Sequence, residues 1–197
     1  GMVCHQTFQD EDGKWLFPTE VVKQNGKWIK TTNGESVIAG RIEKMSKSKR
    51  NVVDPETIVE NYGADTARLF MLSDSPPERD MEWTEAGVEG ASRFLKRIYR
   101  LAQDSKLAPI GTKVPHDSEG SALALIKTSH KSIISLSADI ENFRFNRAVA
   151  QLHILANAIS VVKLSDKGAA AAKRFGIETL AQLLSPLSPH IAEEIWQ

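Results

Sequence analysis

The hydrophobic pattern of this chain changes period near residue 54, and that change limits the folds the chain can adopt. Up to residue 40, short apolar segments alternate with turns, and Asn25-Gly26 is the strongest hairpin signal because both residues tolerate a positive φ. From Asp54 onward, apolar residues recur every three or four positions. The sequence therefore predicts a mainly α fold, in which an antiparallel helical bundle follows a small antiparallel β ribbon.

The expected β ribbon consists of short extended segments joined by tight turns. Pro18 ends one segment, because proline cannot donate a hydrogen bond to a strand ladder. The turns are rich in aspartate, asparagine and glycine, which turn conformations favour. We expect extended segments at residues 2–8, 15–17, 21–22, 27–29 and 37–40, and turns at residues 10–13, 25–26 and 32–34.

Helix signals divide the rest of the chain. Asp54 is a good N-cap with Pro55 at the first helical position, so a helix is expected from there to Gly63 and a second one at residues 64–72. Thr84 can cap a long helix, and prolines and glycines make residues 104–120 a linker. Further helices are expected at residues 169–184 and from Pro189. The apolar faces are predicted as Val88, Ala91, Leu95, Ile98, Leu101 and Ala102; Leu123, Ile126, His130, Ile133, Ser137 and Ile140; and Phe145, Ala148, Val149, Leu152, Leu155, Ala156 and Ile159.

Composition excludes several classes of protein. The single cysteine, Cys4, rules out an internal disulfide framework and a cysteine-rich zinc cage. No apolar run reaches the roughly 18 residues of a membrane span, so we expect no membrane partner and a reducing, cytoplasmic setting. The formal net charge is zero, yet 25 basic and 25 acidic residues are unevenly spread, so a polyanionic partner is not excluded. Nothing in the pattern predicts an oligomer.

One basic segment stands out between the β ribbon and the first helix cap. Residues 41–50 hold five basic residues and one acidic residue with little apolar content, which predicts an exposed loop. Interleaved serine and lysine offer hydroxyl, backbone N–H and ammonium donors to a polyphosphate. A solvated linker or a localisation patch is the alternative that composition alone leaves open.

The loop contains the string Lys44-Met45-Ser46-Lys47-Ser48. This string is identical to the K-M-S-K-S signature of class I aminoacyl-tRNA synthetases, and residues 51–55 and 62–70 resemble the segment that follows it in the enzymes for large hydrophobic amino acids. Residues 1–3, 75–83 and 87–91 resemble leucyl-tRNA synthetases of the bacterial type more closely than the isoleucyl, valyl or methionyl ones. Residues 184–196 resemble a late helix of the anticodon-binding bundle. The resemblance thus runs from end to end.

The resemblance implies roles for the loop. Members of the family activate an amino acid with ATP and Mg²⁺ and then transfer it to tRNA; leucine, ATP and tRNA(Leu) are the implied partners. By motif position, Lys44 and Lys47 are the implied catalytic residues. The implied ATP-binding set is Lys44, Met45, Ser46, Lys47 and Ser48. Stabilising charge on the phosphates is the chemistry that such mobile cations supply.

The resemblance also implies that this chain is a piece of a larger enzyme. The second nucleotide signature of the family, His-Ile-Gly-His, is absent, and residues 189–192 share two of its letters only. We divide the chain into residues 1–83, the end of a catalytic domain, and residues 84–197, a truncated anticodon-binding-type bundle. Alone, it is not expected to activate leucine. A stand-alone tRNA-binding module and a fragment of an isoleucyl, valyl or methionyl enzyme are the alternatives.

A basic face on the long helix is the candidate tRNA contact. Arg93, Lys96, Arg97 and Arg100 recur at spacings of three and four, opposite the apolar stripe. A merely solvated face is the alternative. Recognition of anticodon bases is not predicted. His130, His153, His190 and Cys4 are expected to be structural, and no metal site is predicted, because no second ligand stands at metal spacing.

Overall fold

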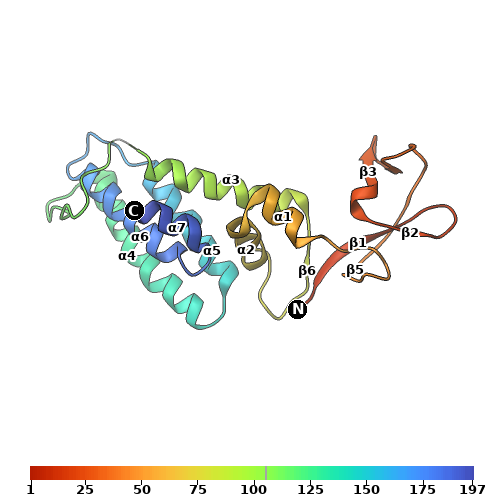
Figure 1. Cartoon of the computed structure of the whole chain (residues 1–197). Coiled ribbons are helices and arrows are strands. Elements are labelled where there is room, and N and C mark those ends of the chain that lie inside the picture. The colour runs from red at the N-terminus through yellow and green to blue at the C-terminus, as the bar shows by residue number, and fades with distance from the viewer. Residues whose placement is uncertain (105) are drawn as a thin grey trace.

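The computed structural model describes residues 1–104 and 106–197. The molecule is elongated, with the strands at one end, α1 and α2 in the middle and the remaining helices at the other end (Figure 1). No helix in these two ranges combines the length and the apolar character needed to cross a membrane. The predicted fold class, a helical bundle preceded by a small β ribbon, is confirmed.

The strands form two small sheets. In the first, the central strand β1 (Val3–Gln9) pairs antiparallel with β2 (Trp15–Leu16) and with β5 (Ile38–Lys44), and its first residues pair parallel with β6 (Met81–Glu82). The second is the hairpin of β3 (Val21–Gln24) and β4 (Lys27–Lys30), which follows a short 3₁₀ turn, η1 (Pro18–Glu20). At its tip Asn25 and Gly26 have φ values of 48° and 80°, as the sequence predicts.

Two features of the first sheet differ from the prediction. Strand β5 continues to Lys44, so the first four residues of the predicted exposed loop, 41–44, are strand. Their backbone pairs with β1, where Lys44 lies opposite Cys4. The parallel strand β6 was not predicted, since two paired residues are too few to produce a hydrophobic period.

The helices follow the predicted capping signals. Asp54 accepts a hydrogen bond from the N–H of Glu56, and Thr84 accepts one from the N–H of Gly87. The predicted linker separates α3 from α4, and its residue 105 lies outside the described residues. The helices are α1 (Pro55–Tyr62), α2 (Ala64–Ser73), α3 (Glu85–Ala102), α4 (Gly120–Glu141), α5 (Phe145–Ser160), α6 (Ala169–Leu184) and α7 (Pro189–Trp196).

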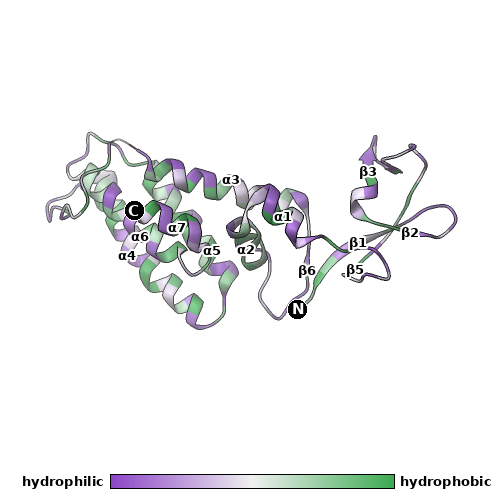
Figure 2. Ribbon diagram, viewed as in Figure 1, coloured by the Kyte–Doolittle hydropathy of each residue, from purple (hydrophilic) through white to green (hydrophobic). Residues whose placement is uncertain are grey.

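One contiguous apolar core holds the helices together. It includes side chains from α2 and from every helix from α3 to α7, and its centre is the face of α5 that the sequence predicts. Leu152, Leu155 and Ile159 of that face are completely buried. Each helix carries hydrophobic and hydrophilic residues along its length (Figure 2), the pattern expected where one face packs and the other meets water. A separate small cluster of Phe8, Leu16, Val21 and Val37 serves the strands.

The predicted apolar face of α4 was wrong by one position. The buried residues are Ala122, Leu125, Ser129, Ser132, Leu136 and Asp139, whereas the predicted Leu123 and Ile133 are exposed. The small side chains of the buried face let α4 approach α5 and α6 closely. At Gly176 of α6, even an added Cβ would lie 3.0 Å from Ile159 and 3.2 Å from Leu125. Close backbone approach therefore outweighs side-chain hydrophobicity in choosing this face.

Polar contacts fix α2 to the turn between α6 and α7. Arg68 donates from Nε to the carbonyl of Leu187 (3.1 Å) and from its terminal nitrogen to that of Pro186 (3.1 Å). Asp65 accepts from the N–H of Ile191 (2.7 Å) and lies 2.9 Å from Nδ1 of His190. These contacts join residues about 120 positions apart and fix the place of α1 and α2 relative to the bundle.

Candidate functional site

The loop at residues 44–50, called the signature loop below, begins where β5 ends. The N–H of Met45 still donates to the carbonyl of Val3 (3.0 Å), and the next residue, Ser46, turns away from the sheet. Its N–H donates to Oδ1 of Asn51 (2.8 Å). The loop is thus anchored at its first residues by strand pairing and at its end by Asn51.

Asn51 fixes the base of the loop from inside. Its side chain is completely buried, and its Nδ2 donates to the carbonyls of His5 (3.1 Å), Glu43 (3.2 Å) and Lys44 (3.3 Å). One amide thereby connects β1, β5 and the returning chain. Hydrogen bonds are directional, so they fix the path of the loop more sharply than apolar contacts would. Sequence reasoning did not single out Asn51, because a buried asparagine has no periodic signal.

The tip of the signature loop is a tight turn. The N–H of Arg50 donates to the carbonyl of Lys47 (3.3 Å), and the hydroxyl groups of Ser46 and Ser48 lie 2.8 Å apart. Both hydroxyls therefore face the same side of the turn. They can reorient toward an anionic ligand, because a hydroxyl both donates and accepts.

The structure divides the cations of the loop into two groups. Lys49 forms an ion pair with Glu43, and Arg50 lies 3.5 Å from the carboxylate of Glu20. Lys44 and Lys47 are exposed, and neither takes part in an ion pair or side-chain hydrogen bond within the described ranges. The two lysines that the family motif singles out thus keep their charge available for an anion.

A cavity of about 680 Å³ lies beside the loop. Lys47 is the one predicted ATP-binding residue among its lining, and Lys44, Met45, Ser46 and Ser48 are not part of it. The other walls include Phe17 from the β ribbon side, Ile58 and Tyr62 from α1, and Trp83. Because these walls are mostly apolar, the cavity is unsuited to a triphosphate.

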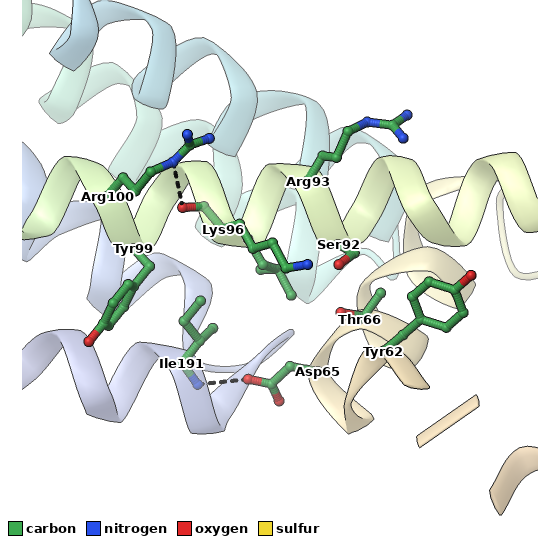
Figure 3. Close-up of a pocket in the computed structure, with 10 residues that line it drawn as sticks. Tyr62, Asp65, Thr66, Ser92, Arg93, Lys96, Tyr99, Arg100 and Ile191 are labelled. Atoms are coloured by element: carbon green, nitrogen blue, oxygen red, sulfur yellow. Dashed lines mark hydrogen bonds between the residues drawn. The ribbon is translucent and has the colours of Figure 1, made fainter. Parts of the chain in front are cut away.

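The basic face of α3 borders a second hollow, of about 670 Å³ (Figure 3). Arg93, Lys96 and Arg100 line it together with Tyr62 and Tyr99. In Figure 3 the guanidinium groups of the two arginines point away from Tyr62 and Asp65, whereas Lys96 points between α3 and α2. Cations beside aromatic side chains can accept phosphates, and the tyrosine faces can accept a base.

Arg97, the fourth predicted residue, does not line this hollow. Its terminal nitrogen donates to Oγ of Ser160 (3.1 Å) at the end of α5, on another side of α3. The structure therefore brings three of the four predicted residues together. Tyr99 was missed by sequence reasoning, although its spacing of three from Lys96 places it on the same face.

Acidic groups moderate the charge of the hollow. Arg93 forms an ion pair with Glu89 one turn earlier (3.3 Å), and Arg100 donates from Nε to the carbonyl of Lys96 (3.3 Å). Asp65 also lines the hollow, but its carboxylate is engaged by the start of α7. Lys96 is therefore the cation of this face with the fewest competing partners.

His153 packs on an aromatic ring, and Cys4 is buried. His153 stacks on Phe94 with ring centroids 3.6 Å apart, and burial, with a smaller effect from the charge of Arg97, lowers its pKa below the usual value. Burial, with help from Asp80 and Glu82, raises the pKa of the Cys4 thiol. Among the described residues, no group of three or more histidine, cysteine, aspartate and glutamate side chains is placed to hold a metal ion.

Two protein families match separate parts of the chain. Residues 32–84, which contain the signature loop, match the family described as tRNA synthetases class I (I, L, M and V). Residues 123–197, which contain most of α4 and all of α5 to α7, match the family described as the anticodon-binding domain of tRNA ligase. The two matches together cover the signature loop, α1, α2 and most of the helical bundle.

Curated relatives match the chain over its full length. A leucine–tRNA ligase of Paramagnetospirillum magneticum is 50% identical over 197 residues, and one of Rhodospirillum rubrum is 49% identical over 199 residues. Each match covers 100% of this chain but 23% of the relative. The chain therefore spans about a quarter of the length of the curated relatives it matches.

Solved structures show the same arrangement of elements. The chain is similar to the leucyl enzyme of Agrobacterium radiobacter K84 in a ternary complex with tRNA and LeuAMS, with a TM-score of 0.65 and 27% identity over 78% of this chain and 20% of that one. It also shares its fold with a Mycobacterium tuberculosis methionyl-tRNA synthetase bound by methionyl-adenylate. There the TM-score is 0.60 and the identity 13%, over 98% of this chain and 70% of that one.

Proposed function

This chain is a segment of the leucyl-tRNA synthetase family of class I ligases, and we propose that it supplies the ATP-phosphate loop and a tRNA-contacting bundle to such an enzyme. Lys44 and Lys47 of the signature loop are the catalytic residues of the proposal. The observation that carries it is the division of charge in the loop: Lys49 and Arg50 are engaged by Glu43 and Glu20, whereas the two motif lysines are not.

The proposed reaction is activation of leucine. The leucine carboxylate attacks the α-phosphorus of ATP, a new O–P bond forms, and the bond to the bridging oxygen breaks as pyrophosphate leaves with the electron pair. Lys47 and Lys44 offset the negative charge that accumulates on the leaving phosphates, and the hydroxyls of Ser46 and Ser48 donate hydrogen bonds to them. Met45 lies at the strand end, where its N–H donates to the carbonyl of Val3 and ties the segment between Lys44 and Lys47 to β1. Cations on a mobile loop can bind this charge more tightly than the free substrate.

Mg²⁺ enters this proposal as part of the ATP substrate. The signature loop offers cations and hydroxyls rather than the carboxylates and carbonyls that Mg²⁺ prefers, and Glu43, the acidic side chain just before the loop, is paired with Lys49. The loop is therefore unsuited to hold the ion itself. Further parts of a full-length ligase complete the site, and the setting we propose is the cytoplasm.

The test of the phosphate assignment is the variant Lys47→Ala in the full-length ligase that contains this chain. Leucine-dependent ATP–pyrophosphate exchange should fall roughly 100-fold, the size of effect seen when one charge-stabilising donor is removed, with a smaller change in the KM for leucine. Lys23→Ala removes an exposed lysine of the β ribbon and is the matched control. An unchanged exchange rate in Lys47→Ala would remove the assignment. The 197-residue chain alone should show no leucine-dependent exchange.

The bundle is proposed to contact the phosphate backbone of tRNA(Leu) through Arg93, Lys96 and Arg100, with Arg97 as a weaker participant. Binding of leucine tRNA to the chain should be weak and should fall as salt rises, because each phosphate contact releases counterions. In a filter-binding titration at two salt concentrations, Lys96→Ala should reduce the salt slope by about one, and Arg97→Ala should reduce it less. Salt-independent binding would contradict the electrostatic contact.

A further inference from the structure

Arg50, the last residue of the signature loop, has an unusual backbone conformation. Its φ is 56°, in the left-handed region that side chains other than glycine and asparagine seldom adopt. The conformation closes the turn in which the N–H of Arg50 donates to the carbonyl of Lys47. Since this conformation costs energy, contacts of the side chain must offset it.

The side chain of Arg50 makes those contacts with residues 15–20. A terminal nitrogen donates to the carbonyl of Trp15 (3.3 Å) and lies 3.5 Å from Oε2 of Glu20. The guanidinium carbon lies 4.1 Å from the centroid of the Phe17 ring. Carbonyl, carboxylate and ring thus surround one guanidinium, and a planar cation is suited to all three at once.

Residues 15–20 are themselves rigid enough to act as a support. Oε2 of Glu20 also accepts a hydrogen bond from the N–H of Phe17 (2.6 Å), which closes the short turn η1. Leu16 is buried in the small cluster beneath the strands. The neighbouring Lys49 lies 6.0 Å from the centroid of the Trp15 ring, so a second loop residue reaches the same segment.

The loop is therefore attached at two places of different character. Asn51 is completely buried and fixes the loop base, whereas the Arg50 and Glu20 side chains are 35% and 40% exposed. Lys47 lies between these attachments, and it lines the same cavity as Phe17 and Pro18. A change in the outer attachment moves the turn that carries Lys47, while the inner one keeps the loop base in place.

We propose that Arg50 is a positioning residue, which holds the signature loop against residues 15–20 and thereby sets where Lys47 meets the phosphates of ATP. The inference rests on the proposed function, because it assigns Lys47 to the phosphates. Arg50 itself does not touch the substrate. The segment that precedes the loop by some thirty residues thus contributes to ATP binding without contributing a ligand.

The first experiment measures the loop directly, by hydrogen–deuterium exchange on the 197-residue chain. Arg50→Asn relieves the backbone strain, because asparagine accepts a positive φ, and it removes the guanidinium contacts. Amides at residues 45–50 should exchange faster in this variant, whereas those of α4 to α6 should not change. Unchanged exchange at residues 45–50 would overturn the proposal.

The second experiment measures ATP–pyrophosphate exchange in the full-length ligase. Arg50→Asn and Arg50→Ala should both raise the KM for ATP about fivefold, as expected for the loss of one hydrogen-bonded contact, and leave the KM for leucine unchanged. Glu20→Gln keeps the acceptor for the Phe17 N–H but loses the charge, and it should raise the KM for ATP less. Combined with Arg50→Asn it should add little, because the two side chains share one contact.

Lys23→Ala is the matched control, since Lys23 lies over the ring of Trp28 (5.8 Å) in the same part of the molecule but away from the loop. An unchanged KM for ATP in Arg50→Asn together with a raised KM in Arg50→Ala would overturn the proposal. The positive φ of residue 50, and not the contacts of the arginine side chain, would then position the loop. Failure of the proposed function is distinguishable from failure of this proposal. If the proposed function failed, Lys47→Ala would leave ATP–pyrophosphate exchange unimpaired, while hydrogen–deuterium exchange would still report on the Arg50 contact.

Discussion

The two ends of this molecule reach order by opposite means. In the bundle, Leu152, Leu155 and Ile159 are completely buried within one continuous apolar core. In the loop region, β5 is exposed along nearly its whole length, and its apolar side chains Ile38 and Ile42 are 59% and 50% exposed. The loop beyond it is held by hydrogen bonds to the buried amide of Asn51 and by the contacts of Arg50 with residues 15–20 rather than by an apolar core.

The difference shows what each end is built for. Apolar burial contributes much free energy and is non-directional. It therefore stabilises a bundle without fixing the exact position of each surface side chain. Hydrogen bonds contribute less free energy, but they fix position, which suits a loop that must present two lysines. The free energy of unfolding should therefore depend mainly on the bundle, and the position of the lysines on Asn51 and Arg50.

Removal of a core side chain in the bundle should have the largest effect on stability. Leu152→Ala deletes a completely buried side chain and should lower the free energy of unfolding by about 3–4 kcal/mol, measured by urea denaturation. Ile154→Ala, two residues away on α5 and 49% exposed, is the matched control and should cost about 0.5 kcal/mol or less. Equal effects would mean that the core of the isolated chain is not packed around α5.

Removal of the buried amide should have a smaller effect on stability but a sharper local effect. Asn51→Ala leaves the carbonyls of His5, Glu43 and Lys44 without their donor and should cost about 1–3 kcal/mol. Hydrogen exchange should rise at residues 44–50, with no change in α5. Asn157→Ala changes an exposed asparagine of the bundle and serves as control. If the loop amides were unaffected, the anchor would lie elsewhere.

The smallest effect should be a pH dependence that belongs to the bundle. Burial holds the pKa of His153 below its usual value, so the unfolded chain binds a proton more readily than the folded one. The contribution of His153 is complete above about pH 6.5, the ordinary histidine value, and is lost as the pH falls through the lowered folded pKa. Urea midpoints measured from pH 7.5 to pH 5 should decline less in His153→Leu than in the unmodified chain.

His116→Leu changes an exposed histidine between α3 and α4 and should leave that decline as it is. The loss of unfolding free energy should be largest for Leu152→Ala, smaller for Asn51→Ala and smallest for protonation of His153. A larger loss of unfolding free energy in Asn51→Ala than in Leu152→Ala would contradict the view that the bundle core dominates stability.

Local signals predicted much of this fold. The caps Asp54 and Thr84, the Asn25-Gly26 turn and the face of α5 depend on neighbouring residues alone, so the sequence contains what is needed. The face of α4 could not be predicted in this way. Its buried serines are chosen by the close approach of α6, which depends on residues such as Gly176 more than 30 positions away.

In the candidate site, too, features that depend on neighbouring residues could be predicted and features that depend on distant residues could not. The motif identified the loop that carries Lys44 and Lys47, because a motif is local. Neither Asn51 nor the departure of Arg97 toward Ser160 could be predicted, since both depend on long-range partners. Polar side chains that bond to distant backbone leave no period in the sequence.

The contacts of α2 with the turn after α6 also restrict how this chain can change length. Residues 186 and 189 are prolines, which have no N–H, and Asp65 and Arg68 supply the partners of the groups around them. These two side chains are one helical turn apart, so both depend on a single rotational setting of α2. One residue inserted between Asp65 and Arg68 would turn one of the two side chains by about 100° relative to the other, so the two contacts could no longer form together. The spacing between Asp65 and Arg68 is therefore a fixed length.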